Sequence, residues 1–421
     1  MMRNNLAVII LAAGKSTRMK SQIPKVLHPI CGRPMLGYVL DLVKDLKVKT
    51  AIAVLGYKHE EVKDVLPAGM RTVRQKKLLG TADAVKTALP LLKNFKGTVL
   101  ILYGDNPLLK KESLRKLLDY HRKNKADATL LTATVEKPTG YGRIVRDKFG
   151  SICRIVEDKD ADDFDRNIKE INTGIMCFSK DKLEAALRRV KPDNRKKEYY
   201  LTDVIGFIYR KGCLIESVRL SDIQEAQGVN SRNELAIAES VMRKRITDEW
   251  MTKGVTIVDP DSTFIGFGCK IGQDTIIYPF TIIESDVKIG KRCCVGPFAH
   301  LRCGTVIDND VVIGNFLEVV RSRIASKTIA KHFCYLGDSR IGRAVNIGAG
   351  TVTANFDGRN KHITTIDDYS FIGSNTALVA PVKVGKFCLT GAGSVVIKNI
   401  PEKTTVVGVP AYPIKKRGSY G

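Results

Sequence analysis

The C-terminal part of this 421-residue chain carries an aliphatic residue at every sixth position, a pattern that few folds accommodate. Glycine often follows that residue, as at Gly266 and Gly272. An α-helix repeats its faces every 3.6 residues and a flat strand every two, so neither accounts for a period of six. The register is unbroken through Ile265, Ile271, Ile277, Ile283, Ile289, Val295, Leu301, Ile307, Ile313 and Val319.

A triangular coil accounts for this period, with one short strand per hexapeptide and about 18 residues per turn. Each aliphatic side chain would point inward and stack on its equivalent one coil above, at roughly the 4.8 Å spacing of neighbouring strands. Glycine and small polar residues would occupy the corners, where positive φ is needed. The register therefore predicts a parallel β-helix of hexapeptide repeats over residues 254–421, in preference to an irregular β-sandwich.

The repeat is interrupted at about residues 320–335 and again at 354–365. It resumes at Ile341 after the first interruption and at Ile366 after the second. Breaks in a strict repeat usually mark inserted loops, and loops commonly carry function. We therefore expect an inserted loop at both places.

Residues 1–230 follow a different pattern, in which apolar strand candidates alternate with amphipathic segments such as 35–44 and 112–123. This alternation predicts a Rossmann-like α/β domain with a largely parallel sheet. Residues 231–253 are predicted to be a connecting helix, with Ser231 and Glu234 spaced for a capping box. The strand candidates are Leu6–Leu11, Thr50–Leu55, Thr98–Leu102, Ala128–Val135 and Ile175–Phe178.

The net charge of +25 invites a nucleic-acid interpretation. The basic residues are spread along the chain without an arginine-rich arm, so we expect no specific nucleic-acid binding and attribute the charge to phosphorylated small molecules. The ten cysteines lack metal-ligand spacing, which indicates reduced thiols and a cytoplasmic location. No run approaches about 18 apolar residues, so no membrane span is expected.

The loop after the first strand, Ala12-Ala13-Gly14-Lys15-Ser16-Thr17, resembles the end of a Walker A motif. Walker A requires a glycine where Ile9 stands, which excludes a P-loop. The small residues still allow backbone N–H groups to face a triphosphate, and Arg18 and Lys25 would add positive charge. Nucleotidyl transfer depends mainly on positioning and on neutralising phosphate charge, which these groups could provide.

Asp105 lies just beyond the strand candidate Thr98–Leu102, in the segment Tyr103-Gly104-Asp105-Asn106. Ligands of open α/β sheets bind at the carboxyl ends of the strands. A carboxylate there is a suitable hard ligand for Mg²⁺ bridging to phosphate. A simple turn aspartate is the alternative.

These motifs resemble the bifunctional N-acetylglucosamine-1-phosphate uridylyltransferase/glucosamine-1-phosphate acetyltransferase family, and the resemblance runs nearly end to end. Further segments match that family's base-reading, sugar-binding and metal-sharing motifs. They are Gln75 with Leu79-Gly80-Thr81, Gly140-Tyr141-Gly142-Arg143-Ile144, Ile155-Val156-Glu157, Glu170-Ile171-Asn172-Thr173-Gly174 and Gly228-Val229-Asn230.

The resemblance implies that the sugar-1-phosphate attacks the α-phosphorus of UTP in line and expels pyrophosphate. It casts Arg18 and Lys25 as catalytic groups, with Mg²⁺ held by Asp105 and Asn230. Glu157, Asn172 and Gly140, taken singly, could instead be structural. The implied UTP-binding residues are Leu11, Ala12, Gly14, Lys25, Gln75, Gly80 and Thr81, and the implied sugar-binding residues are Gly140, Glu157, Asn172 and Asn230.

For the C-terminal half, the resemblance implies a left-handed β-helix that forms a homotrimer and acetylates glucosamine-1-phosphate from acetyl-CoA. A base is needed to take the amine proton, and the ordinary pKa of histidine suits that task near neutral pH. His332 is cast as this base. The implied glucosamine-1-phosphate residues are Arg302, Tyr335, Asn346 and Lys361, and the implied acetyl-CoA residues are Ala349, Asn355, Ser374 and Ala392.

Two departures bear on the acetyltransferase interpretation. Val320 stands where the family usually carries a phosphate-binding lysine, and Gly408 stands where an arginine that contacts coenzyme A is common. The neighbouring Arg321 could replace the lysine, although adjacent strand residues point to opposite faces. The chain is also shorter than is typical of the family. The missing length amounts to about two coils and falls before Arg302. The alternatives are a monofunctional nucleotidylyltransferase whose β-helix only oligomerises, and a non-catalytic scaffold built on the same folds.

Overall fold

The computed structural model describes residues 5–15 and 17–414 of the chain. The chain divides into two compact units, Met1–Val241 and Met242–Gly421, with the boundary inside one helix. The predicted division at residues 230/231 and 253/254 stays a prediction. Within the described residues, no helix is both long and apolar enough to cross a membrane.

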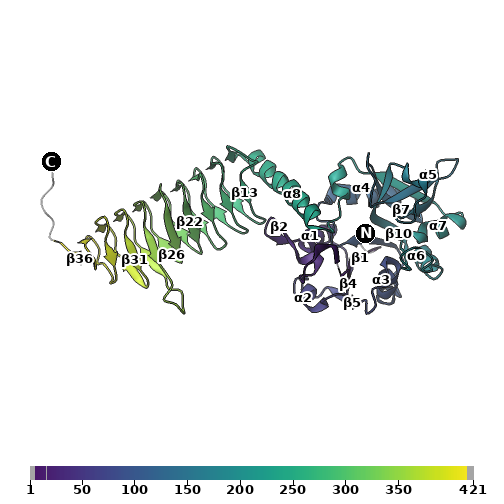
Figure 1. Cartoon of the computed structure of the whole chain (residues 1–421), viewed down its shortest axis with the longest axis horizontal. Coiled ribbons are helices and arrows are strands. Elements are labelled where there is room, and N and C mark those ends of the chain that lie inside the picture. Colours follow the sequence, from purple (N-terminus) through teal and green to yellow (C-terminus); the bar gives the residue numbers. More distant parts are fainter. Residues whose placement is uncertain (1–4, 16, 415–421) are drawn as a thin grey trace. The chain divides into compact units, whose positions relative to one another are not determined.

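The first unit is built on a mixed β-sheet whose strand order is β11-β7-β10-β6-β1-β4-β5 (Figure 1). Strands β4, β1 and β6 are parallel, as expected, but β10 runs antiparallel to both β6 and β7. A hairpin of β8 and β9 joins the sheet through β10. The strands span Leu6–Ala12 (β1), Thr50–Leu55 (β4), Arg71–Arg74 (β5), Thr98–Tyr103 (β6), Ala128–Thr134 (β7), Gly142–Arg146 (β8), Ile152–Val156 (β9), Glu170–Ser179 (β10) and Ile215–Arg219 (β11).

Helices cover both faces of this sheet because each buries an apolar stripe against it. One face packs on α1 (Met35–Leu46), α2 (His59–Lys63) and α4 (Lys111–Lys123). The other packs on α3 (Thr81–Ala88), α6 (Lys180–Leu187) and α7 (Asp203–Arg210). The remaining short elements are α5 (Asp163–Arg166), the hairpin β2 (Pro29–Ile30) with β3 (Arg33–Pro34), and the 3-10 turns η1 (Thr17–Met19), η2 (Lys25–Leu27), η3 (Leu89–Leu92) and η4 (Ile223–Ala226).

The predicted connecting helix is α8 (Arg232–Thr252), which contains the boundary between the units. Its first turn follows the expected capping box in part. The Ser231 hydroxyl accepts a hydrogen bond from the Glu234 N–H at 3.3 Å. The Glu234 carboxylate reaches back to the Asn230 N–H at 2.6 Å, one residue before the position that a capping box uses.

Within the described part of the second unit, short strands form three faces of a triangular coil, and they pair in parallel except for β36, which runs antiparallel to β35 (Figure 1). The first face holds β12 (Thr256–Ile257), β15 (Ile276–Ile277), β18 (Cys294–Val295), β21 (Val312–Ile313), β24 (Ile329–Ala330), β27 (Asn346–Ile347), β30 (Phe371–Ile372), β33 (Leu389–Thr390), β35 (Thr405–Val407) and β36 (Tyr412–Pro413). The second holds β13 (Phe264–Ile265), β16 (Ile282–Ile283), β19 (His300–Leu301), β22 (Leu317–Val320), β25 (Cys334–Gly337), β28 (Val352–Ala354), β31 (Ala377–Val379) and β34 (Val395–Val396). The third holds β14 (Lys270–Ile271), β17 (Lys288–Ile289), β20 (Val306–Ile307), β23 (Arg323–Ile324), β26 (Ser339–Ile341), β29 (Thr364–Ile366) and β32 (Val382–Val384).

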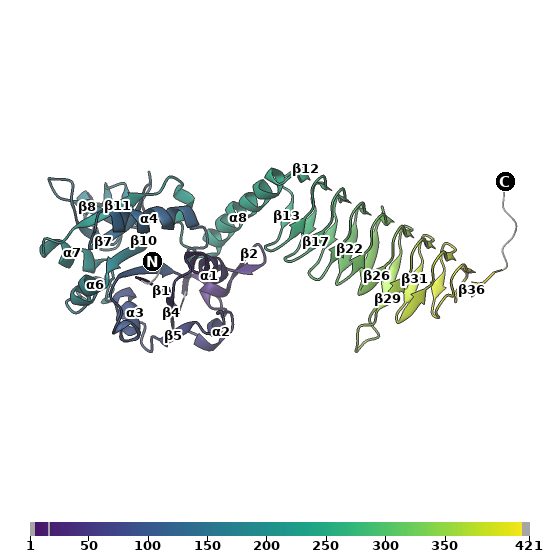
Figure 2. The same cartoon turned by 180° about the vertical axis from the view of Figure 1, so that it is seen from behind.

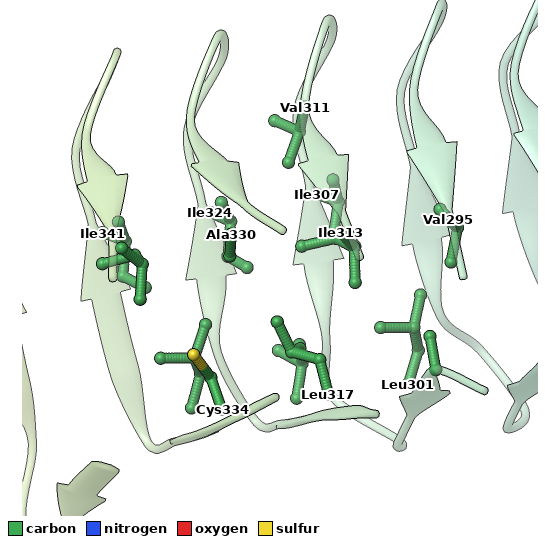
Figure 3. Close-up of a cluster of buried hydrophobic side chains, with 14 of the residues drawn as sticks. Val295, Leu301, Ile307, Val311, Ile313, Leu317, Ile324, Ala330, Cys334 and Ile341 are labelled. Atoms are coloured by element: carbon green, nitrogen blue, oxygen red, sulfur yellow. The ribbon is translucent and has the colours of Figure 1, made fainter. Parts of the chain in front are cut away.

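The predicted aliphatic stack forms the core of this unit. Residues such as Val295, Ile313 and Ala330 are fully buried and lie one above another inside the coil (Figure 3). The same buried core continues through Ile324 and Ala330, where the sequence pattern is interrupted. The β-helix prediction is therefore confirmed, and it extends through the first interruption.

The two interruptions differ in structure. At the first, Val306 pairs with Arg323, so the coil is 323 − 306 = 17 residues long and contains no inserted loop. Our expectation of a loop there was wrong, because a coil shortened by one residue also shifts the register. At the second, Ser339 pairs with Thr364, and 364 − 339 = 25 residues separate the partners. This coil contains the loop 355–363, which leaves the stack between β28 and β29 (Figure 2).

Candidate functional site

Three predicted residues of the first unit meet at the carboxyl end of the sheet. The Lys25 ammonium group forms an ion pair with the Asp105 carboxylate and donates a hydrogen bond to the Asn230 amide oxygen at 2.8 Å. The side chains of Lys25 and Asp105 are 14% and 15% exposed, so the pair is partly shielded from solvent. The three residues come from positions 25, 105 and 230, and the fold alone brings them together.

The loops that carry these residues are fixed by backbone contacts. The Val229 N–H donates to the Asp105 carbonyl at 2.9 Å, which holds the Gly228–Asn230 segment beside the end of β6. Gly104 lies in close packing, since a Cβ there would lie 3.1 Å from Val26 and 3.2 Å from Leu36. The carboxylate and the amide oxygen are therefore presented at a defined place.

The donor set fits Mg²⁺. Asp105 and Asn230 offer a carboxylate and an amide oxygen, both hard oxygen ligands. Among the described residues, no group of three or more His, Cys, Asp or Glu side chains could hold a metal ion. Mg²⁺ commonly takes one or two protein ligands and completes its octahedron with water and substrate phosphates. The two oxygens thus suit a metal that arrives with a nucleotide.

The predicted base-reading residues form a connected segment. Gln75 is buried, and its amide nitrogen donates to the Gly80 carbonyl at 3.1 Å and to the Asp83 carboxylate at 2.8 Å. Gly80 has a φ of +118°, and a Cβ there would lie 2.5 Å from the Tyr199 carbonyl oxygen. Only glycine fits this position. Thr81 follows directly and begins α3.

The predicted sugar residues lie around the β8–β10 pairing. Asn172 pairs with Gly142, and its side-chain oxygen accepts a hydrogen bond from the Gly174 N–H at 3.0 Å. A register shift in β10 follows Asn172, so this polar side chain lies at an irregular point of the sheet. Gly140 has a φ of +87°, and a Cβ there would meet nothing within 4 Å.

Tyr103 is a residue that sequence reasoning did not select. It ends β6 immediately before Gly104, and a Cβ at Gly174 would lie 3.0 Å from its ring. Burial, with the nearby Glu157 and Asp105 carboxylates, raises the pKa of its phenol, which also hydrogen-bonds to Thr81. Tyr103 therefore lies between the base-reading, metal and sugar residues. Its place at a strand's carboxyl end, two residues before Asp105, was the available signal.

Glu157 lies just beyond β9 in a group of acidic residues. Burial raises the pKa of its carboxyl group, while a hydrogen bond from Thr202 at 3.0 Å opposes that rise. Burial and the charges of Glu157 and Asp160 raise the pKa of Asp203 to about 6. These residues line a cavity of about 850 Å³ together with Arg154, Arg188 and Arg210.

In the second unit, predicted residues line one corner of the coil, between its first and second faces. His332 lies between β24 and β25, and Ala349 occupies the same corner one coil further on. Backbone bonds join successive corners, from the Asn375 N–H to the Ala349 carbonyl at 2.6 Å and from the Gly393 N–H to the Ser374 carbonyl at 2.8 Å. The corner therefore places His332, Ala349, Ser374 and Ala392 in a line along the helix.

Other predicted residues lie on or beside the second face. Arg302 donates to Glu318 at 3.0 Å and lies 3.5 Å from Glu284, which raises the pKa of its guanidinium group. Tyr335 pairs with Glu318 one coil away. The Tyr335 hydroxyl and the Asn355 amide nitrogen both reach over Gly337, where a Cβ would lie within 2.5 and 2.7 Å of them.

One chain does not bring every predicted acetyltransferase residue to the same face. Asn346 lies on the first face, in register with Ile329 and Phe371, whereas Tyr335 lies on the second. Lys361 is exposed in the loop 355–363.

In the first unit, Arg18 is exposed in η1. Leu11 and Ala12 end β1 and are buried, and Gly14 is exposed beyond them.

The structure shows where the two residues that differ from the family motifs, Val320 and Gly408, lie. Val320 is 3% exposed and pairs with Gly337. Arg321 forms a two-pronged ion pair with Asp338, at 2.6 and 2.7 Å. Gly408 has a φ of +100°, a conformation that an arginine rarely adopts.

Two family models match this chain. The family model described as a MobA-like NTP transferase domain matches residues 8–196, and the bacterial transferase hexapeptide model, of six repeats, matches residues 268–303. A solved structure of UDP-glucose pyrophosphorylase in complex with UDP-glucose aligns with 57% of this chain and 99% of its own, at 18% identity and a TM-score of 0.48.

Curated relatives extend along nearly the whole chain. The bifunctional protein GlmU of Geobacillus sp. strain WCH70 is 44% identical over 427 residues, covering 94% of this chain and 93% of the relative. The protein of the same name from Lactococcus lactis subsp. cremoris strain SK11 is 43% identical and covers 96% of this chain and 95% of its own length. That from Shouchella clausii strain KSM-K16 is 42% identical, with 94% of each chain covered.

Proposed function

The chain belongs to the bifunctional GlmU family, which makes UDP-N-acetylglucosamine by acetyl transfer to glucosamine-1-phosphate and uridylyl transfer to N-acetylglucosamine-1-phosphate, and on that premise we propose which residues carry each reaction. The chain is accordingly a uridylyltransferase and an acetyltransferase, acting on nucleotide, sugar-phosphate and acetyl-CoA substrates. Its hexapeptide repeats indicate an oligomer.

Uridylyl transfer is assigned to the group of Lys25, Asp105 and Asn230. The contact of Lys25 with both oxygens supports this assignment, because it places a cation where phosphate charge develops. Lys25 and Arg18 would stabilise the triphosphate while a sugar-phosphate oxygen forms a bond to the α-phosphorus and the bond to pyrophosphate breaks. Asp105 and Asn230 would hold Mg²⁺, which when bound neutralises phosphate charge.

Substrate orientation is assigned to the surrounding residues. Gln75, Gly80 and Thr81 would orient the uracil, with Leu11, Ala12 and Gly14 beside the nucleotide. Gly140, Glu157, Asn172 and Asn230 would orient the sugar, and we add Tyr103 because it lies between these groups. The reaction requires no covalent intermediate on the protein.

Acetyl transfer is assigned to the corner that carries His332. The sugar amine nitrogen would attack the thioester carbonyl while the imidazole takes the proton from that amine, and coenzyme A leaves as the thiolate. Ala349, Ser374 and Ala392 on the same corner, with Asn355, would bind acetyl-CoA. Arg302, Tyr335, Asn346 and Lys361 would bind the amino sugar phosphate.

A homotrimer is the assembly that fits this site best. Asn346 and Tyr335 lie on different faces of one chain, so a complete site would draw its residues from neighbouring subunits. Sedimentation should therefore give a mass near three times the chain mass of 46.5 kDa. A monomer that retains acetyl transfer would contradict this proposal. We also propose a cytoplasmic location, supported by the ten cysteines, which form no disulfide within the described residues.

One assay of both reactions tests the proposal. Pyrophosphate release should be fastest with UTP and N-acetylglucosamine-1-phosphate among matched nucleoside triphosphates and sugar-1-phosphates, and chelation of divalent cations should abolish it. Thiol release from acetyl-CoA should require glucosamine-1-phosphate and should survive chelation. Absence of thiol release at saturating substrate would reassign the β-helix to oligomerisation alone.

A further inference from the structure

Thr202 lies at the N-cap of α7, but its hydroxyl does not cap the helix. An N-cap threonine ordinarily accepts a hydrogen bond from the second or third N–H of its helix. Within the described residues, the Thr202 side chain forms no such capping bond, and its φ and ψ are −61° and −26°. Instead, its hydroxyl donates to the Glu157 carboxylate at 3.0 Å. The Thr202 hydroxyl therefore donates a hydrogen bond to Glu157 and, in the part of the chain that the structure describes, forms no capping bond with α7.

The Glu157 carboxylate needs such a donor, because its surroundings oppose its negative charge. Burial disfavours the ionised form, and neighbouring carboxylates repel it. Lys196 is the cation that acts in the other direction. The titratable groups that influence Glu157 or are influenced by it are Lys196, Asp158, Asp160, Asp203, Tyr103 and Tyr200.

Thr202 is itself held in place by the base-reading segment. The Leu201 N–H donates to the Thr81 hydroxyl at 2.9 Å, and the Ala82 N–H donates to the Tyr199 carbonyl at 2.9 Å. Thr202 is 5% exposed and Leu201 is fully buried, so the segment 199–202 has little room to move. The donor to Glu157 is therefore fixed to the same backbone that carries Gly80 and Thr81.

We propose that Thr202 is a positioning residue for sugar binding, whose hydroxyl orients the Glu157 carboxylate toward the hydroxyl groups of N-acetylglucosamine-1-phosphate. The proposal rests on the proposed function, since it takes Glu157 as a sugar ligand. An ionised carboxylate accepts hydrogen bonds from sugar hydroxyls through both oxygens, and these bonds are stronger than those to a protonated carboxyl group. A fixed donor on one oxygen leaves the other free to face the substrate.

Thr202→Val removes the hydroxyl and keeps the shape of the side chain. A hydrogen bond to a charged group has a strength that corresponds to about a tenfold change in binding. The KM for N-acetylglucosamine-1-phosphate should therefore rise about tenfold, while the KM for UTP stays unchanged. Thr202→Ser keeps the hydroxyl and should restore the wild-type value. Thr87→Val, which removes another threonine hydroxyl of this unit, is the matched control.

The pH profile provides a second readout. The bond from Thr202 lowers the pKa of Glu157, so its loss raises that pKa further. Glu157 would then be protonated at a higher pH. The acid limb of kcat/KM for the sugar phosphate should move to higher pH in Thr202→Val but not in Thr202→Ser or Thr87→Val.

The variant Glu157→Gln distinguishes the role of Thr202 from the role of Glu157. If Glu157→Gln raises the sugar KM and Thr202→Val changes neither that KM nor the pH profile, the role of Thr202 is overturned and that of Glu157 stands. If Thr202→Ser is as impaired as Thr202→Val, packing and not the hydrogen bond is responsible, and the proposal is again overturned. If Glu157→Gln leaves the sugar KM unchanged, Glu157 is not a sugar ligand, and both its assignment under the proposed function and the role of Thr202 are overturned.

Discussion

Replacing Asp105 with alanine should lower the rate of uridylyl transfer by at least about 10²–10³-fold, the usual cost of removing one preorganised group that stabilises transition-state charge. The substitution removes the proposed carboxylate ligand for Mg²⁺ and also the ion-pair partner of Lys25. Pyrophosphate release from UTP and N-acetylglucosamine-1-phosphate, measured across a range of Mg²⁺ concentrations, checks the effect. Acetyl transfer should stay at the wild-type rate, because its residues belong to the other unit.

Matched variants identify the cause of the loss. Asp105→Asn keeps an oxygen ligand without the charge, so it should retain more activity at high Mg²⁺ than Asp105→Ala does. Asp45→Ala removes a carboxylate of the same unit that is 47% exposed and paired with Lys111, and it should leave both activities unchanged. Pyrophosphate release that survives Asp105→Ala would place the metal elsewhere.

Replacing His332 with glutamine should lower acetyl transfer about 10²–10⁴-fold, because glutamine can form hydrogen bonds but cannot accept the amine proton at neutral pH. The measurement is thiol release from acetyl-CoA with saturating glucosamine-1-phosphate. Uridylyl transfer should be unaffected. Together with Asp105→Ala, this variant separates the two activities of the chain.

A surface control accompanies this variant. Arg340 is exposed on β26, on the third face and away from the corner of His332. Arg340→Ala should retain acetyl transfer. If His332→Gln keeps the wild-type rate over the whole pH range, another group accepts the proton and the assignment of His332 is wrong.

The fold was predictable wherever a single repeat or a local pattern determines it. The six-residue register specified the β-helix, because each inward aliphatic side chain makes the same contact one coil away. Strand Thr50–Leu55 was predicted to the residue. By contrast, the antiparallel direction of β10 was not predicted, since a buried apolar run looks the same in either direction.

The candidate site was predictable from motifs but not from contacts. The family resemblance already placed Asp105 and Asn230 on one Mg²⁺, whereas the contact of Lys25 with both residues depends on the topology of the sheet. Tyr103 and Thr202 were missed because neither residue type carries a signal of its own. Tyr103 is important because of the residues around it. Thr202 is important because its hydroxyl bonds to Glu157 and not to its own helix.

The coils of the β-helix behave as interchangeable steps of nearly constant length. Strand β16 pairs with β19 through 300 − 282 = 18 residues, and this spacing recurs in the coils before Arg302. Since each coil contacts mainly its two neighbours, a whole coil can be gained or lost there without changing the spacing of the corners that follow. The length of the helix can therefore vary between related proteins in whole coils while the residues proposed for acetyl transfer, from Arg302 onward, keep their spacing.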